Sequence, residues 1–91
     1  MPGAVRDNKA LHRFEMAAGD DIAVAYYTLA PGVMTFTHTE VPAALGGRGI
    51  GSQLVRGALE AARAQGLKVV PRCSFVSAFI GRHPEFSDLL R

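Results

Sequence analysis

A glycine-rich stretch, residues 41–52, has the residue types and spacing best suited to hold an anion. An apolar segment ends at Val41, four glycines follow within residues 46–51, and an amphipathic pattern then begins. Glycine permits close approach and positive φ, and the first turn of a helix presents unpaired N–H groups and partial positive charge. We predict that this loop binds the pyrophosphate of a nucleotide-like cofactor. The donors would be the backbone N–H groups of Gly47, Arg48, Gly49, Ile50, Gly51 and Ser52.

The alternative is that the loop only starts a helix. Glycines that no ligand or packing requires would cost about 0.5–1 kcal/mol each, which favours the anion site. Two familiar phosphate-binding patterns do not fit. The G-x-G-x-x-G spacing is absent, because Gln53 and Leu54 follow Gly51, and no Lys-Ser or Lys-Thr pair follows the loop.

Cys73, the single cysteine, is a candidate nucleophile. It follows Pro71 and Arg72 and stands just before a predicted helix. A thiol near a helix N-terminus and beside a cation can have a lowered pKa. A small buried apolar side chain is the equally weighted alternative, since most free cysteines have that role. The sequence identifies no partner base for this thiol, so both interpretations stay open.

His38 is a candidate general base. It alternates with Glu40 along a predicted strand, so the two side chains share a face. Either could deprotonate an ammonium group directly or through water. For Glu40 we favour a plain surface role, whereas His38 stays open. His12 and His83 give no catalytic signal, and three separated histidines predict no metal site.

The elements that position these residues can be predicted from the hydrophobic pattern. We expect strands over residues 11–17, 22–29 and 33–41, joined by short turns into an antiparallel three-stranded meander. In the first strand Phe14 and Met16 would face the core, with Arg13 and Glu15 facing water. Residues 1–9 are polar, and we expect a flexible N-terminal tail there, followed by one domain over residues 10–91.

After the glycines the apolar period becomes helical. Apolar residues from Ile50 to Ala62 recur on one face, and Gly66 would end this helix. A strand over residues 67–71 completes a βαβ unit, so it should lie parallel to the preceding strand. A C-terminal helix over residues 74–82 and a last helical turn over residues 86–90 follow. The fold class is therefore α/β, or α+β.

Composition narrows the function classes. The 91 residues are 48% hydrophobic and 20% charged, as expected for one globular domain. A net charge of +2 is too dilute for nucleic-acid binding, and no apolar run approaches the roughly 20 residues that cross a bilayer. One cysteine excludes an internal disulfide, and no signal peptide is evident. We expect a cytoplasmic protein without nucleic-acid or membrane partners.

The glycine-rich stretch resembles the pyrophosphate motif of the GNAT superfamily of acetyl-CoA-dependent N-acetyltransferases, Arg/Gln-x-x-Gly-x-Gly/Ala. Gly49 and Gly51 match, whereas Gly46 stands where the motif has Arg or Gln, which removes one polar side chain. The chain from about residue 11 to residue 90 also resembles a short single-domain subgroup, the YjdJ-like proteins. The segments that carry this resemblance are residues 38–42, 49–52, 68–76 and 82–85.

The resemblance implies a compact GNAT-like acyl-CoA N-acyltransferase fold that binds acetyl-CoA or CoA. Gly46 would open the cofactor loop, and Val41 would end the strand that contacts the pantetheine arm. The strands before and after the central helix would splay around the thioester, where a neutral amine attacks its carbonyl. In the subgroup the residue matching Cys73 is regarded as catalytic. The tyrosine acid of larger relatives is absent, and the helix offers Phe79.

Two function classes follow. The first is an N-acetyltransferase that moves an acetyl group from CoA to an amine of a small molecule or protein. The second is a non-catalytic CoA-binding or protein-interaction module. Relative to larger members, we expect the elements that build the acceptor site to be absent. A second protomer in a homodimer, or a protein partner, is one way to complete that site.

Overall fold

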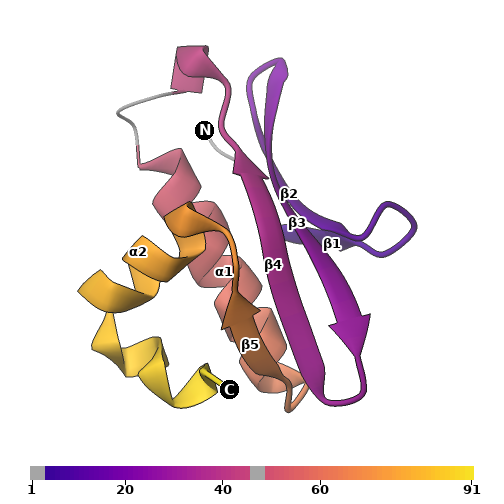
Figure 1. The fold of residues 1–91 in the computed structure, drawn as a ribbon. Coiled ribbons are helices and arrows are strands. Elements are labelled where there is room, and N and C mark those ends of the chain that lie inside the picture. Colours follow the sequence, from indigo (N-terminus) through magenta and orange to yellow (C-terminus); the bar gives the residue numbers. More distant parts are fainter. Residues whose placement is uncertain (1–3, 46–48) are drawn as a thin grey trace.

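The computed structural model describes residues 4–45 and 49–91, which form a five-stranded sheet with helices on one face (Figure 1). In spatial and chain order the strands are β1 (Arg6–Asn8), β2 (Arg13–Ala18), β3 (Asp21–Ala30), β4 (Val33–Glu40) and β5 (Lys68–Pro71). The helices are η1 (Ala43–Leu45), α1 (Ile50–Ala64), α2 (Ser74–Arg82) and η2 (Pro84–Leu89), of which η1 and η2 are short 3-10 helices. The mixed α+β class expected from the sequence is confirmed.

The predicted strands over β2, β3 and β4 form an antiparallel meander, as expected. Phe14 and Met16 are buried against the helices, and so are the alternate residues Ala23, Ala25 and Tyr27 of β3. The residues between them point to the opposite face of the sheet, which we call the open face. It bears no helix in residues 4–45 or 49–91.

The N-terminal part of the fold differs from the prediction. Residues 6–8, which we expected in a flexible tail, form β1 and pair antiparallel with β2, so the antiparallel part has four strands and not three. Just before this strand, Val5 packs on α1 at Gly57, where a Cβ would lie 2.6 Å from a Val5 methyl. Glycine in mid-helix is therefore required here by close packing of the N-terminal segment.

The central helix α1 is confirmed. Its apolar face is buried, and the helix ends where Gly66 takes φ 71°. The Gly66 N–H donates to the carbonyl of Arg63 and the Leu67 N–H donates to that of Ala62, which pairs carbonyls of the last turn. The buried members of α1 are Ile50, Gly51, Leu54, Val55, Ala58, Leu59 and Ala62.

A β-bulge near the end of β4 was not predicted. Tyr27 pairs with Phe36 and Tyr26 pairs with His38, so Thr37 is one extra residue on β4. An extra residue shifts the alternation of all side chains beyond it. His38 therefore lies on the open face with Tyr26, while Thr39 pairs with the buried Ala25 and points toward the helices.

Strands β4 and β5 are parallel neighbours, as the βαβ prediction requires. They pair over only part of β4. Residues Val33 to Phe36 pair with Lys68 to Pro71, after which the two strands separate. Beyond this point β4 continues to Glu40, and the chain after β5 turns into α2 (Figure 1). We call this gap in the strand pairing, on the β5 side of the last four residues of β4, the opening.

Candidate functional site

The ends of three elements meet at one corner of the molecule, beside the opening between β4 and β5. Val41 follows β4, Gly51 lies in the first turn of α1, and Phe75 lies in the first turn of α2. A Cβ on Gly51 would lie 2.5 Å from the Phe75 ring and 3.1 Å from a Val41 methyl. Gly51 is thus needed because the Phe75 ring, itself 36% exposed, packs directly against the α1 backbone.

The N-terminus of α1 has the features of an anion site. Its N-cap residue Gly49 has φ 71° and no side chain, so no side-chain oxygen caps the first N–H groups of the helix. Ile50 and Gly51 are buried, and Ser52 is partly exposed. The other predicted cofactor residues, Gly46, Gly47 and Arg48, lie outside the described residues.

Cys73 lies at the opening between β4 and β5, where the chain turns from β5 into α2. It is the N-cap residue of α2, its backbone N–H donates to the carbonyl of Phe36, and its thiol lies 3.3 Å from the Thr39 hydroxyl. Burial raises the pKa of the thiol, but hydrogen bonding with Thr39 and with backbone N–H groups at the start of α2 outweighs it. The pKa of Cys73 consequently lies below its ordinary value, which favours the nucleophilic thiolate.

His38 lies on the opposite face of β4 from this thiol. Its ring stacks on Tyr26 at 6.2 Å between centroids, and its Nε2 lies 3.4 Å from a carboxylate oxygen of Glu40. Both side chains are more than half exposed. The shared face predicted for His38 and Glu40 is therefore present. However, the bulge directs the His38 side chain away from Cys73, and it directs the Thr39 side chain toward Cys73.

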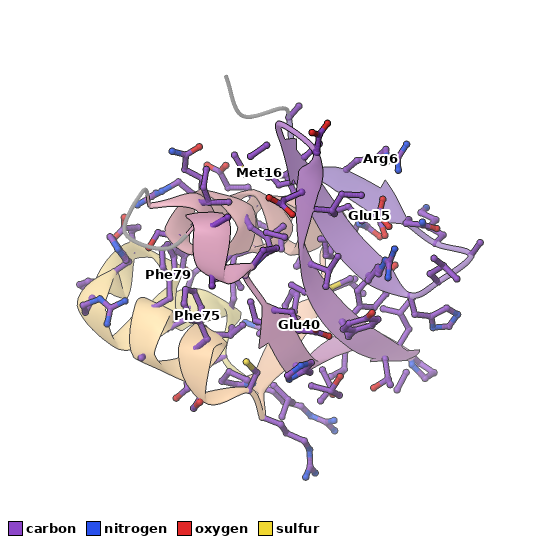
Figure 2. The ribbon with its side chains drawn as sticks, turned by 90° about the horizontal axis from the view of Figure 1, so that it is seen from above. Arg6, Glu15, Met16, Glu40, Phe75 and Phe79 are labelled. Carbon is purple, nitrogen blue, oxygen red and sulfur yellow. The ribbon has the colours of Figure 1, made fainter. Side chains whose placement is uncertain are left out.

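The open face also holds a buried carboxylate that the sequence suggested would face water. Glu15 is 5% exposed and accepts hydrogen bonds from Arg6, Asn8 and Arg13. The hydrogen bond from Arg6, with those from Arg13 and Asn8, lowers the pKa of Glu15 to about 2. Figure 2 shows Arg6 and Glu15 on the side of the sheet away from the helices, and Phe75 and Phe79 on the helical side.

Arg13 extends this network toward a surface hollow. Its Nη1 donates to the Tyr26 hydroxyl at 3.0 Å, and its guanidinium lies over the Tyr26 ring at 5.7 Å. The hollow has a volume of about 520 Å³ and reaches from Arg13 and Tyr26 to Thr39 and Glu40. It thus adjoins the β4 segment that leads to the corner with Cys73.

His83 has a structural role. Its ring packs on Phe79 with centroids 4.2 Å apart, and its Nδ1 lies 3.3 Å from a guanidinium nitrogen of Arg56. Among the residues that the structure describes, no cluster of His, Cys, Asp and Glu could hold a metal ion. Within the same residues, each helix is too short or too polar to span a membrane.

Comparison with known proteins identifies the family. Residues 13–89 match the family model of GCN5-related N-acetyl-transferases, so the chain belongs to this family. A solution NMR structure of a GCN5-like protein from Staphylococcus aureus has the same fold, with a TM-score of 0.74 at 23% sequence identity. The match covers 96% of this chain and 86% of the bacterial chain.

Sequence reasoning missed three residues around the site, namely Thr39, Arg13 and Tyr26. Thr39 was hidden by the bulge, because simple alternation from Phe36 would put it on the open face. Arg13 lay at a predicted outward position, and the register of β2 and β3 pairs it with Tyr26, which the sequence pattern assigned to neither the core nor the surface. Cys73 and His38 were both found from the sequence, but not their separation by the sheet.

Proposed function

We propose that this chain is an acetyl-CoA-dependent N-acetyltransferase whose cofactor binds at the corner of β4, α1 and α2. The observation that carries this proposal is the opening between β4 and β5 beside an uncapped helix N-terminus. Backbone N–H groups in the first turn of α1, together with residues 46–48, would hold the pyrophosphate. The pantetheine arm would run past Val41 into the opening, with Phe75 as its side wall.

The geometry of the opening suits acyl transfer. Residues 37–40 of β4 have no β5 partner, and a backbone N–H of this segment would donate to a thioester oxygen. An amine that loses its proton to water or to a side-chain base attacks the carbonyl carbon. A β4 N–H then stabilises the oxyanion before the C–S bond breaks and CoA leaves as the thiol.

Cys73 provides a second route through the same opening. Its thiolate would attack the acetyl carbonyl and expel CoA as the thiolate, which takes a proton from water. A neutral amine would then attack the acetyl-Cys73 thioester, displace the Cys73 thiolate and lose a proton to water to give the amide. The short thiol–hydroxyl distance to Thr39 and the lowered pKa of Cys73 support this route. Direct transfer from CoA to the amine needs neither feature, so substitution of Cys73 distinguishes the direct route from the covalent route.

Calorimetric titration with acetyl-CoA, followed by a thiol-release assay on an amine panel, tests the proposal. We expect saturable binding and amine-dependent release of CoA. Binding without release on any amine would favour a CoA-binding module, and no binding would contradict both. A Cys73→Ala variant with undiminished transfer would exclude the covalent route, whereas trapping of an acetylated Cys73 by mass spectrometry would support it.

The short single-domain YjdJ-like subgroup is the assignment we propose within the family. The segments that resemble this subgroup, residues 38–42, 49–52, 68–76 and 82–85, support the assignment. A homodimer is part of this proposal, because a second protomer is one way to complete the acceptor site. Sedimentation equilibrium measures it directly, and a monomer at high concentration would contradict it.

A further inference from the structure

The hollow on the open face has a charged group at each end and an apolar floor. Arg13 and Tyr26 line one end and Glu40 lines the other, with Ile22 and Val24 between them. Thr39 also contributes to its wall, and the Thr39 hydroxyl contacts the thiol of Cys73. A molecule in the hollow would therefore lie next to the strand segment at which the acetyl group would be delivered.

The Arg13 end carries uncompensated positive charge. Glu15 supplies one negative charge, which it shares between Arg6 and Arg13, so these three side chains have a net charge of +1. Arg13 binds Glu15 through Nε and Tyr26 through Nη1. Its Nη2 donates no hydrogen bond within residues 4–45 and 49–91, and the side chain is 24% exposed. An Arg held in place with free N–H groups is suited to a carboxylate.

The opposite end carries a negative charge. The Glu40 side chain is 59% exposed, and the imidazole of His38 is its only ion-pair partner among the described residues. Glu40 and Arg13 belong to strands two positions apart in the sheet and are offset by two residues along it, so their backbones are separated by roughly 12 Å. A small molecule with an ammonium group and a carboxylate can satisfy both ends at once, whereas a plain amine leaves Arg13 without an anion.

We propose that the hollow binds the acetyl acceptor, and that this acceptor is a small amino acid with its carboxylate on Arg13 and its amino group toward Glu40. This inference rests on the proposed function, because an acetyl acceptor is needed only if the chain transfers acetyl groups. Arg13 acts here as a specificity-determining residue, positioned by Glu15 and Tyr26. Glu40, with His38 beside it, attracts the ammonium form, which must then lose a proton before attack.

The test compares acceptors matched in shape but not in charge. γ-Aminobutyrate is paired with butylamine, and β-alanine with propylamine, in the thiol-release assay. We expect kcat/KM for the amino acid to exceed that for its partner by about tenfold or more, as expected for a charge-assisted carboxylate contact. In Arg13→Gln this ratio should fall to near one, and Arg13→Lys should keep part of it.

Arg6→Gln is the matched control. It also removes a guanidinium from Glu15, but Arg6 does not line the hollow, so the ratio should stay that of the wild type. Equal kcat/KM for amino acids and amines in the wild type would overturn the inference while leaving acetyl transfer intact. An equal loss of the ratio in Arg6→Gln and Arg13→Gln would also overturn it.

Failure of the proposed function is recognised separately, as absence of acetyl-CoA binding in calorimetry. The hollow is then tested without cofactor, by following the backbone amide signals of Tyr26 and Thr39 during titration with γ-aminobutyrate or butylamine. We expect saturable shifts with the amino acid only, and their loss in Arg13→Gln. Shifts of the same size with both ligands, or with neither, would overturn the inference.

Discussion

At the residue scale, the thiol of Cys73 is defined by two contacts from different parts of the chain. The Thr39 hydroxyl approaches it from β4, and N–H groups at the start of α2 face it from the other side. Both favour the thiolate, and together they outweigh the burial of a side chain that is 8% exposed. A cysteine that only filled the core would need neither contact.

Removal of the Thr39 hydroxyl should therefore raise the pKa of Cys73. We expect the pH dependence of Cys73 alkylation by a small reagent to have its midpoint below that of an ordinary thiol, and to move upward in Thr39→Val. Mass spectrometry across a pH series gives both midpoints. Thr37→Val, which changes the neighbouring residue of β4, is the control, and an identical shift in both variants would contradict the assignment to Thr39.

Glu15 is the second residue whose environment has a measurable consequence. Its pKa is lowered from 4.5 to about 2, so the folded state favours the carboxylate more than the unfolded state does. A lowered pKa contributes stability above the unfolded pKa, and that contribution is lost as the pH falls from about 4.5 toward 2.

Glu15→Gln should remove this contribution. At neutral pH we expect the free energy of unfolding to fall by about 2 kcal/mol, since three hydrogen bonds to a charged, buried group are weakened. The difference between wild type and variant should shrink as the pH falls from about 4.5 toward 2. Urea unfolding at several pH values measures this difference, and a constant difference across that range would contradict the proposed protonation.

The candidate residues could be predicted from their types, but their relative positions could not. Cys73 was visible because a lone thiol preceded a helix, and His38 because it alternated with Glu40. The Thr39–Cys73 contact depends on one extra residue in β4. Nothing in the local residue types marks Thr37 as that extra residue. Simple alternation therefore could not predict which face of the sheet the side chains after Thr37 point to.

At the element scale, two helices and four strands had sequence patterns strong enough to predict. β1 was missed because Arg6, Asp7 and Asn8 are polar and have little strand preference. They form a strand because β2 offers an unpaired edge, Glu15 offers a buried carboxylate, and Tyr27 donates to Asp7. These are tertiary contacts between residues that are distant in the sequence, so a local sequence pattern does not predict them.

Two helical glycines provide a matched test of this packing. An alanine methyl at Gly57 would overlap Val5, whereas at Gly81 it would meet nothing within 4 Å. We expect Gly57→Ala to destabilise the protein by about 1–2 kcal/mol through overpacking. Gly81→Ala should stabilise it by about 0.5 kcal/mol, because alanine is the better helix former. Thermal unfolding measures both, and stabilisation by both would show that the N-terminal segment does not pack on α1.

At the scale of the whole molecule, the sheet separates two surfaces. The helical side closes the core and brings α1, α2 and Cys73 to the opening, where we place the cofactor. The open side bears the charged network and the hollow, where we place the acceptor. The last residues of β4 lie between them, so a reaction at that segment would join the two surfaces.

The order and direction of the elements from β2 onward were predicted, because they follow from the short turns and from the βαβ spacing. The charged network could not be predicted in the same way. It depends on the register of three strands, which places Arg6 opposite Glu15 and Arg13 opposite Tyr26. Register is set by the whole sheet and its turns, and the sequence pattern alone left Glu15 as a surface residue.

The central claim is that the N-terminus of α1 holds the pyrophosphate of CoA, and an NMR titration of the backbone amides tests it most directly. With coenzyme A we predict saturable shifts at residues 49–52, Val41 and Cys73. Pantetheine, which lacks the pyrophosphate, should leave the amides of residues 49–52 unchanged. Saturating coenzyme A that shifted no amide at this corner, or only amides of η2 and the open face, would contradict the account.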